Sequence, residues 1–296
     1  MILELPWLPP AEIVRVNGRG EFFVRRHQHP DPSRPTLLLL HGWTASADLQ
    51  FFSAYRELAE QWSFIALDHR GHGRGLRTVE PFTLEDVADD AAAVARQLGV
   101  EQTIAIGYSM GGPVSMLLAQ RHGDLVVGLV PQATALEWRA TRRERLMWKL
   151  LPLAGTGMRS RFYARYISRG LPTLIPDTHP LAAYRTWITA ETRRNFPTAV
   201  IQAGTALSTY DARSWAGTLD VPAAMMITTG DRLVKPRKQR ALAAALGAEV
   251  REIAADHLAP WEQPEEFAAL TVELVSDVVA RVRRAADQGS AEFASA

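Results

Sequence analysis

The stretch TIAIGYSMGG, residues 103–112, joins an apolar run to a turn in which a serine stands between two glycines. Thr103 to Ile106 is short and apolar, which is typical of a strand buried on both faces. Helical periodicity follows over Met110 to Arg121. The turn itself, Gly107-Tyr108-Ser109-Met110-Gly111, matches the pattern G-x-S-x-G. The stretch therefore predicts a buried strand, a sharp turn that presents the Ser109 hydroxyl, and a helix.

The glycines around Ser109 fit the demands of a serine nucleophile. A serine hydroxyl is weakly nucleophilic, so a site that uses it must expose the oxygen, present a base and supply donors for the developing oxyanion. Glycines two residues before and two after Ser109 relieve crowding at such a turn. Alone, the pentapeptide also fits a glycine-rich helix start that holds a solvated or capping serine. The apolar strand in front of it favours the nucleophile.

Similar elements recur on both sides of this stretch. Further apolar runs predict buried strands over Thr36 to Leu40, Phe64 to Leu67, Leu125 to Val130, Ala223 to Thr228 and Glu249 to Ile253. Helical stretches lie between several of them, over Gln50 to Gln61, Leu84 to Leu98 and Lys238 to Leu246. A hairpin is predicted at the start of the chain, around Asn17-Gly18. Alternating strands and helices favour an α/β fold with a mostly parallel sheet flanked by helices.

A second motif, His41-Gly42-Trp43, follows the predicted strand Thr36 to Leu40. Acyl-transfer chemistry needs two donors for the oxyanion, and loss of one costs about 2.7–4 kcal/mol of transition-state stabilisation. The amide of Met110, next to the serine, supplies one donor. A turn at Gly42-Trp43 can direct the Trp43 amide as the other. The alternative is that this motif only ends a strand and that Trp43 is a surface or core aromatic residue.

These residues together resemble the α/β-hydrolase superfamily, in particular its esterase-like members with a serine nucleophile, an H-G-x oxyanion loop and a G-x-S-x-G-G elbow. The resemblance extends from about Thr36 to Val282. Residues 68–75, DHRGHGRG, are similar to the D-x-R-G-x-G turn of the same family, which is ordinarily structural. We therefore interpret His69 and His72 as solvated or hydrogen-bonded turn residues and not as metal ligands. Ser109 argues against the dehalogenase and epoxide hydrolase branches, which require an aspartate nucleophile.

The resemblance implies that an acid and then a histidine follow the serine along the chain. Asp231 comes directly after the predicted strand Ala223 to Thr228, and His257 follows Glu249 to Ile253. Loops after parallel strands meet at the carboxyl edge of a sheet, where such folds place ligands. We expect Asp231 to orient His257, and His257 to act as the base for Ser109.

Three other carboxylates are alternatives to Asp231 for the role of the acid. Asp211 is the rival to Asp231 because it ends the region that lacks strands, and Asp220 lies ahead of a Val-Pro pair. Asp256 is adjacent to His257, where it is poorly placed to orient the ring. Asp231 is preferred because it directly terminates a strand.

Composition bounds the remaining possibilities. The 296 residues include 33 basic and 32 acidic ones, a formal charge of +1, which is not the signature of a nucleic-acid-binding domain. The chain has no cysteine, which excludes disulfides, a thiolate nucleophile and cysteine-bound metal. The expected chemistry requires no metal and no organic cofactor. Met1 to Pro10 does not resemble a signal peptide, and no apolar run reaches membrane-spanning length, so a cytoplasmic enzyme is expected.

The alternation of strands and helices breaks between about Ala133 and Ala212. Members of the resembled family commonly carry a helical cap at this place. The predicted organisation is a core over residues 1–132 and 213–284, a helical cap insertion over 133–212 and a flexible tail over 285–296.

The insertion has two features that bear on the substrate. Thr134 to Val200 contains twelve basic and four acidic residues, which can dock an anionic lipid interface, attract an acidic or phosphate-bearing substrate, or form a solvated helix face. Its apolar residues either line an acyl pocket or form the core of the cap: Leu146, Met147, Trp148, Leu150, Leu151, Leu153, Met158, Phe162, Tyr163, Tyr166, Ile167 and Trp187.

The sequence thus predicts a serine hydrolase that cleaves a carboxylic ester through an acyl-enzyme intermediate, with a lipid-like or medium-chain ester as a candidate substrate. The same residues also fit a thioesterase, a lactonase, a C–C bond hydrolase or a perhydrolase. A receptor that binds a ligand and turns it over slowly is a further alternative. The spacing of the residues does not separate these activities, and it does not give the oligomeric state.

Overall fold

A computed structural model describes residues 5–158 and 177–295 of the chain, and in this part an eight-stranded sheet forms the centre of the molecule. The strand order is β1-β2-β4-β3-β5-β6-β7-β8. The strands are β1 (Ala11–Val16), β2 (Gly20–His27), β3 (Thr36–Leu40), β4 (Ser63–Leu67), β5 (Thr103–Tyr108), β6 (Val126–Gln132), β7 (Ala224–Thr228) and β8 (Glu249–Ile253). From β4 through β8, neighbouring strands run parallel, as the sequence predicted.

The antiparallel part of the sheet lies at one edge, where the first two strands of the chain are. β1 pairs with β2, and β2 pairs with β4, in antiparallel register. The turn between β1 and β2 includes Gly18 with a φ of +74°, a conformation that glycine adopts without strain. The predicted hairpin at the edge of the sheet is confirmed.

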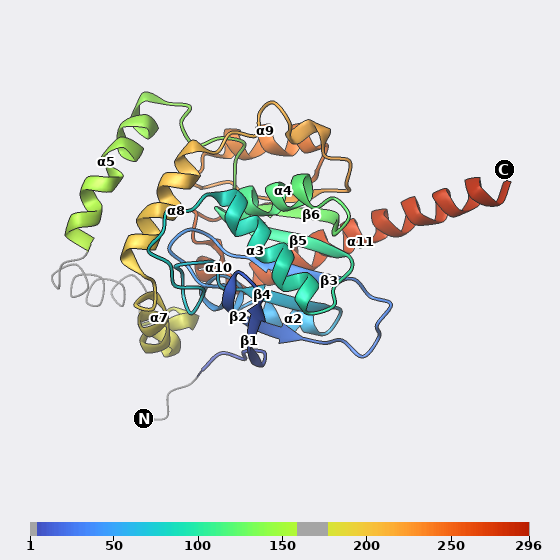
Figure 1. The fold of residues 1–296 in the computed structure, drawn as a ribbon, viewed down its shortest axis with the longest axis horizontal. Helices are drawn as coiled ribbons and strands as arrows, with labels where there is room; N and C mark the ends of the chain where they lie inside the picture. The colour runs from blue at the N-terminus through green and yellow to red at the C-terminus, as the bar shows by residue number, and fades with distance from the viewer. Residues whose placement is uncertain (1–4, 159–176, 296) are drawn as a thin grey trace.

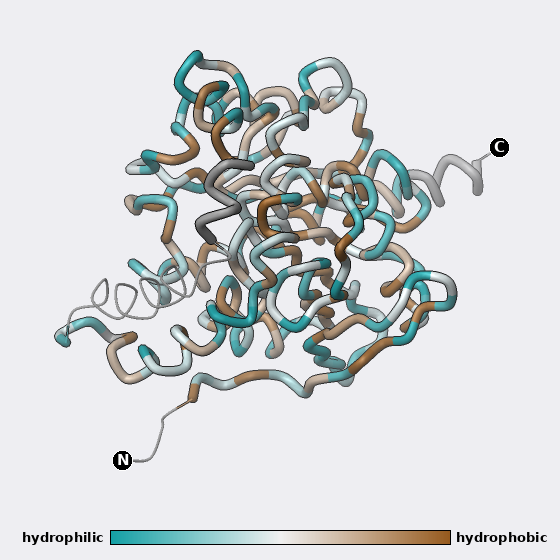
Figure 2. The backbone as a smooth tube through the Cα atoms, turned by 60° about the vertical axis from the view of Figure 1, so that its left-hand side comes forward, coloured by the Kyte–Doolittle hydropathy of each residue, from teal (hydrophilic) through white to brown (hydrophobic). Residues whose placement is uncertain are grey.

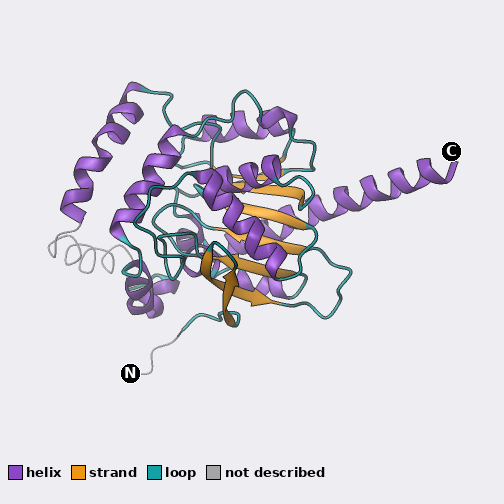
Figure 3. Ribbon diagram, viewed as in Figure 1, coloured by secondary structure: helices purple, strands orange, loops and turns teal. Residues whose placement is uncertain are grey.

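Helices cover both faces of the sheet (Figure 1). One face packs against α3 (Leu84–Gln97), α4 (Gly111–Arg121) and α9 (Pro236–Leu246). The other face packs against α1 (Ala47–Phe51), α2 (Tyr55–Ala59) and α11 (Pro264–Ser295), with the short α10 (Ala259–Glu262) in front of α11. The layered arrangement of strands and helices is visible in Figure 3.

The strand β3 shows why helices must cover both faces of this sheet. Leu38 and Leu40 belong to the core on the α3 and α4 side, whereas Leu37 and Leu39 belong to the core on the α11 side. Successive side chains of a strand point to opposite faces, so an uninterrupted leucine run buries apolar surface on both. Hydrophobic segments accordingly gather toward the middle of the molecule in Figure 2, and hydrophilic ones lie mostly on its outer loops.

Two local predictions differ from the structure. The predicted helix over Gln50 to Gln61 is broken into α1 and α2. β8 was grouped with the strands buried on both faces, but it is the edge strand, and only Ile253 of its five residues is buried. Its sequence, EVREI, has three charged residues out of five, which suits an exposed edge strand.

The insertion separates β6 from β7. Between these strands the described residues form α5 (Arg142–Met158), η2 (Pro180–Tyr184), α7 (Arg185–Thr192), α8 (Pro197–Thr209) and η3 (Ala216–Thr218). The two ends of the insertion meet, because Glu137 and Asp211 form an isolated antiparallel bridge. The helices α5, α7 and α8 lie together at one side of the molecule (Figure 1). The exact boundaries at 133 and 212 stay a prediction.

The C-terminal segment, residues 285–295, continues the helix α11, which projects from the side opposite the insertion (Figure 1). Its flexibility remains a prediction. No helix within the described ranges, 5–158 and 177–295, is both long and apolar enough to cross a membrane.

Candidate active site

Ser109 lies in the sharp turn between β5 and α4, in a left-handed backbone conformation. Its φ is +52°, which costs a residue with a side chain about 1–2 kcal/mol. A Cβ atom added to Gly107 would lie 2.1 Å from the carbonyl oxygen of Gly111, and one added to Gly111 would lie 1.9 Å from the carbonyl oxygen of Leu40. Both motif glycines are therefore required by close backbone contact, as the sequence predicted.

The structure brings Ser109, His257 and Asp231 together in one hydrogen-bonded chain. His257 Nε2 lies 2.9 Å from Ser109 Oγ, and His257 Nδ1 lies 2.7 Å from Asp231 Oδ2. The three residues follow β5, β7 and β8, so they meet at the carboxyl edge of the sheet. Because a carboxylate only accepts, Nδ1 of His257 carries the proton and Nε2 presents its lone pair to the serine.

Asp231 is held by more donors than the histidine alone. It is 2% exposed, and its Oδ1 accepts from the amides of Leu233 at 2.8 Å and Val234 at 2.7 Å. Its Oδ2 also accepts from Thr228 Oγ1 at 2.8 Å and Gln239 Nε2 at 3.1 Å. Five donors fix both carboxylate oxygens, so the orientation of the histidine ring is fixed as well.

The rival carboxylates lie elsewhere. Asp211 is exposed and forms an ion pair with Arg213 at 2.6 Å, and Asp220 is exposed. Asp256 Oδ1 accepts from the backbone amides of His257 and Arg232, at 2.7 and 2.9 Å, so it holds the loop and not the imidazole ring. Only Asp231 of these four candidates contacts a ring nitrogen of His257.

The two predicted oxyanion donors flank Ser109. Met110 follows the serine at the start of α4, where the first amides of a helix have no intrahelical acceptor. Trp43 follows Gly42, and a Cβ on Gly42 would lie 3.2 Å from Ser109 Cβ, so this loop passes directly beside the serine. Within the described residues, neither the Trp43 nor the Met110 amide donates to a protein acceptor. Both donors are free for a ligand.

The loop that carries Trp43 is held by the insertion. Trp43 Nε1 donates to the carbonyl oxygen of Val200 in α8 at 2.7 Å. Thr44 has a φ of +65°, and its carbonyl oxygen accepts from Asn195 Nδ2 at 2.6 Å. The same Asn195 accepts from the Gly73 amide at 2.8 Å through its Oδ1. One side chain of the insertion therefore joins two loops of the core beside the serine.

Tyr108, the variable residue before Ser109 in the motif, ties the serine turn to the histidine loop. Its hydroxyl donates to the carbonyl oxygen of His257 at 2.9 Å, and its ring packs 5.8 Å from the His257 ring. Burial raises the pKa of this hydroxyl well above its ordinary value, so it stays protonated and able to donate. Sequence reasoning missed Tyr108, Gln239 and Asn195, because no local pattern indicates side chains that act across loops.

Three histidines lie buried behind the oxyanion loop. The ring of His41 packs 4.2 Å from that of His69 and 5.3 Å from that of His72, and all three are at most 1% exposed. Burial lowers the pKa of His69 to about 3 and that of His72 to about 4. His72 Nδ1 lies 3.2 Å from the carbonyl oxygen of Arg70. The hydrogen-bonded interpretation of His72 fits, but neither histidine is solvated.

Asp68 supports the same turn. It is fully buried and accepts from the amides of Ala47 at 2.8 Å and Arg74 at 2.7 Å. Burial raises its pKa to about 7. A Cβ on Gly73 would lie 2.3 Å from Asp68 Oδ2, so the turn must carry glycine there. The motif over residues 68–75 is structural, as expected. No group of three or more metal-ligating side chains is arranged to hold an ion in the described part of the chain.

A cavity of about 390 Å³ opens onto Ser109 and His257. Its wall is mostly apolar, and it includes Leu49, Trp138, Met147, Trp148, Leu207, Leu233, Val234, Leu258, Pro260 and Trp261. Of the apolar insertion residues that the sequence singled out, Met147 and Trp148 line this cavity, whereas Leu146 and Leu150 are exposed and Trp187 packs in the core. Phe162, Tyr163, Tyr166, Ile167 and the side chains of Leu153 and Met158 lie outside what the structure describes.

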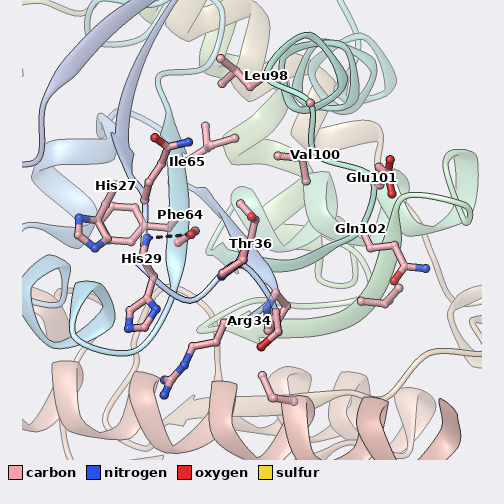
Figure 4. A pocket seen from close by; sticks show the side chains of 18 of the residues that line it. His27, His29, Arg34, Thr36, Phe64, Ile65, Leu98, Val100, Glu101 and Gln102 are labelled. Atoms are coloured by element: carbon pink, nitrogen blue, oxygen red, sulfur yellow. Dashed lines mark hydrogen bonds between the residues drawn. The ribbon is translucent and has the colours of Figure 1, made fainter. Parts of the chain in front are cut away.

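A larger hollow, of about 870 Å³, lies at the amino ends of β3, β4 and β5 (Figure 4). Thr36, Phe64 and Gln102 mark these strand ends in its wall. The His29 amide donates to Ser63 Oγ at 2.9 Å, and Arg34 donates to the carbonyl oxygen of Gln61 at 2.8 Å. These two contacts hold loops together, and the hollow lies at the edge of the sheet opposite Ser109.

Comparison with known proteins defines the class. The family model described as "Alpha/beta hydrolase family" matches residues 37–270, so the chain belongs to this family. It is accordingly classed as a hydrolase.

Individual relatives are similar to different extents. The chain is 31% identical over 260 residues to a pimeloyl-[acyl-carrier protein] methyl ester esterase from Neisseria meningitidis, covering 86% of this chain and 98% of that protein. It is 32% identical over 106 residues to a putative carbamate hydrolase, RutD, from Caulobacter segnis, but this match covers 35% of the chain and 39% of that protein. The solved structure of an enol-lactonase from Burkholderia xenovorans has a TM-score of 0.76 at 20% identity and covers 90% of this chain and all of that one. This last likeness concerns the fold.

Proposed function

We propose that the chain hydrolyses carboxylic esters, with Ser109 as the nucleophile, His257 as the base and Asp231 as the acid that orients it. The observation that carries the proposal is the continuous hydrogen-bonded chain from Asp231 through His257 to Ser109, which ends at a mostly apolar cavity. The full-length similarity to a methyl ester esterase supports the proposal that the bond cleaved is an ester.

The geometry supplies each step of an acyl-transfer reaction. As Ser109 Oγ attacks the ester carbonyl carbon, its proton passes to His257 Nε2 across the 2.9 Å hydrogen bond. The imidazolium that forms is stabilised by Asp231 at 2.7 Å. The tetrahedral intermediate collapses when His257 returns the proton to the leaving alkoxide, and an acyl-enzyme remains. Water, deprotonated by His257, then attacks the acyl-enzyme and releases the carboxylic acid.

The Trp43 and Met110 amides are the proposed donors to the oxyanion. Both amides are free of protein acceptors in the described chain and flank the serine, so charge that develops on the carbonyl oxygen meets two fixed dipoles. The anchoring of Trp43 on α8 keeps its amide in place before the substrate arrives. Such preorganised donors stabilise the transition state more than the ground state.

The cavity favours an apolar acyl or alcohol group of modest size. Tryptophan and leucine side chains form much of its wall, and burial of apolar ligand surface stabilises a complex by roughly 25 cal/mol for each Å². Lys238 and Glu144 also face the cavity, but Lys238 is already paired with Glu144 and with Glu137, each at 3.1 Å. We infer that medium-chain esters suit this site better than polymeric substrates.

A fluorophosphonate and a series of p-nitrophenyl esters test the proposal. We expect the folded protein to be labelled once, at Ser109, and to hydrolyse acyl chains of intermediate length fastest. Ser109→Ala should remove the label. If Ser109 stays unlabelled in folded protein, the proposed chemistry is wrong. If it is labelled but no ester turns over, thioesters, lactones and C–C bonds beside a carbonyl are the substrates to try next, followed by perhydrolysis and slow-turnover ligand binding.

A further inference from the structure

Gln50 occupies a place beside the reacting serine that the mechanism above does not use. It lies in α1, is 7% exposed and lines the 390 Å³ cavity together with Ser109 and His257. A Cβ on Gly42 would lie 3.1 Å from Gln50 Oε1 and 3.2 Å from Ser109 Cβ. The carboxamide and the serine therefore face each other across Gly42.

One end of this carboxamide is already bound. The Gly42 amide donates to Gln50 Oε1 at 3.3 Å, and this contact fixes which end of the side chain is oxygen, because an N–H group needs an acceptor. The Nε2 end carries two N–H donors. In the described part of the chain, neither donor reaches a protein acceptor, and Nε2 is not among the buried polar atoms that lack a partner. It therefore remains open to the cavity.

Several other polar side chains in the cavity wall are already engaged, whereas the buried Nε1 of Trp138 has no acceptor among the described residues. The Tyr108 hydroxyl donates to the His257 carbonyl oxygen, the Thr192 hydroxyl donates to the Ile188 carbonyl oxygen, and Lys238 pairs with Glu144. Gln50 Nε2 is thus a free donor in a mostly apolar wall, close to the bond that reacts. A donor desolvated by a purely apolar acyl group loses its hydrogen bond to water and gains nothing in return.

We propose that Gln50 is a specificity-determining residue, which favours acyl groups that carry a hydrogen-bond acceptor near the ester carbonyl. Its Oε1 is clamped on the Gly42 amide, so Nε2 is held in place to bind an ether, hydroxyl or carbonyl oxygen of the substrate. A site built to hydrogen-bond a substrate group discriminates against the analogue that lacks it, because the protein donor is then left unpaired. This inference rests on the proposed ester hydrolysis at Ser109.

Two esters of equal size measure the preference for an acyl group that carries a hydrogen-bond acceptor. The acyl groups of p-nitrophenyl methoxyacetate and p-nitrophenyl butyrate have the same number of non-hydrogen atoms, and only the first has an ether oxygen beside the carbonyl. Dividing the kcat/KM values gives a selectivity ratio, in which the intrinsic reactivities of the esters cancel between variants. In Gln50→Met, which keeps the length of the side chain but has no N–H donor, we expect this ratio to fall roughly fivefold, as the loss of one hydrogen bond implies.

A second variant distinguishes a role of Gln50 in substrate preference from a role in supporting the Gly42 loop. Gln50→Glu keeps an oxygen for the Gly42 amide but has no N–H donor, so the ratio should fall there too. If Gln50→Glu restores the wild-type ratio, or if Gln50→Met leaves it unchanged, Gln50 only supports the loop and the inference is wrong. Gln97→Met, the same change on the exposed end of α3, serves as the control and should keep the ratio.

The two proposals fail in different ways. Folded variants are confirmed by their melting temperatures and by fluorophosphonate labelling of Ser109. Wild-type protein that neither labels nor hydrolyses either ester overturns the proposed function and the inference with it. Wild-type protein that hydrolyses both esters, with a selectivity ratio independent of Gln50, overturns the inference alone.

Discussion

The two edges of the sheet each carry a hollow, and the volumes of these hollows do not show which one holds the candidate active site. The hollow at the amino edge has about 870 Å³ and the cavity at the carboxyl edge about 390 Å³, yet the smaller one holds the hydrogen-bonded serine, histidine and aspartate. Parallel strands all deliver their following loops to the carboxyl edge, so side chains distant in sequence converge there. The direction of the strands, and not the size of a hollow, places the chemistry.

The polar groups at the two edges are also used differently. At the amino edge, Arg34 and the His29 amide bind protein oxygens and thereby hold loops in place (Figure 4). At the carboxyl edge, the Trp43 and Met110 amides have no protein acceptor in the described chain. These free donors beside Ser109 support the proposed active site at the carboxyl edge. The changes below test this contrast, from the largest expected effect to the smallest.

Removal of the serine or the histidine should have the largest effect. In Ser109→Ala and in His257→Ala we expect kcat on a p-nitrophenyl ester to fall by about 10⁴-fold or more, because neither variant can form an acyl-enzyme by base-assisted attack. Melting temperatures should stay close to that of the wild type, which shows that the fold is kept. Activity within tenfold of the wild type in either variant would place the reacting group elsewhere.

Substitution of Asp231, the proposed acid, should have the second-largest effect on kcat. Asp231→Asn removes the charge that orients His257 and stabilises its protonated form, and kcat should fall by about 10³- to 10⁴-fold. The matched control is Asp211→Asn, which breaks an exposed ion pair with Arg213 and should change kcat less than twofold. Similar losses in the two variants would contradict the assignment of Asp231.

The buried histidines behind the oxyanion loop should make folding stability depend on pH. The folded pKa values of His69 and His72, about 3 and 4, lie below the ordinary 6.5, so their contribution is complete above pH 6.5 and is lost on acidification. Asp68, with a raised pKa of about 7, opposes this change, because its contribution is lost as the pH rises.

Burial also lowers the pKa of His41 well below its ordinary value, so three histidines oppose the single carboxyl group. Between pH 6 and pH 5 we therefore expect the free energy of unfolding to fall by about 2.5 kcal/mol per pH unit, measured by urea unfolding. His69→Phe, which removes one of the three buried imidazoles, should flatten this slope. An unchanged slope in that variant would show that His69 does not take part.

The helix α5 over the carboxyl edge should confer weak attraction to anionic interfaces. It exposes Leu146, Met147 and Leu150 next to the exposed cations Arg143 and Lys149. We expect a few-fold preference for vesicles with anionic lipid over neutral ones in sedimentation at low salt, which declines as salt screens the charges. Equal sedimentation with both vesicles would remove this proposal and leave the enzyme assignment intact.

Changes at the amino edge should have the smallest effect. Arg34→Ala removes the bond to the Gln61 carbonyl oxygen, and His29→Ala removes the ring nitrogen that accepts from the Asp31 amide at 3.0 Å. In both we expect kcat/KM within twofold of the wild type and a loss of unfolding free energy below about 1 kcal/mol, since partly exposed loop contacts contribute little. Steady-state kinetics and thermal unfolding check both values. A large loss of activity would show that the bigger hollow also serves the reaction.

The contrast between the edges also explains what the sequence could reveal. Ser109 stands in a local pattern, and the buried strand before it is readable from consecutive apolar residues. The order of Asp231 and His257 along the chain followed from the resemblance to a family. Tyr108, Gln239 and Asn195 act through contacts between distant loops, which leave no periodic or local signal.

Errors at the sequence level have the same origin. The run Glu249–Ile253 predicted a buried strand, but β8 lies at the edge of the sheet, and this position depends on the order of strands in space. For His69 and His72 the sequence left solvated and hydrogen-bonded positions open, because turns are usually exposed, but both side chains are buried. The packing of α8 on this turn, where a Cβ on Gly71 would lie 2.1 Å from Ala199 Cβ, shows a close tertiary contact there.

The left-handed backbone of Ser109 sets a limit on how this protein can evolve. Glycine would relieve the conformational cost at position 109, but it has no hydroxyl, so the proposed ester hydrolysis and greater stability make opposite demands on this residue. Substitutions that stabilise the protein without loss of the proposed reaction are therefore to be sought elsewhere, in the sheet and the outer helices.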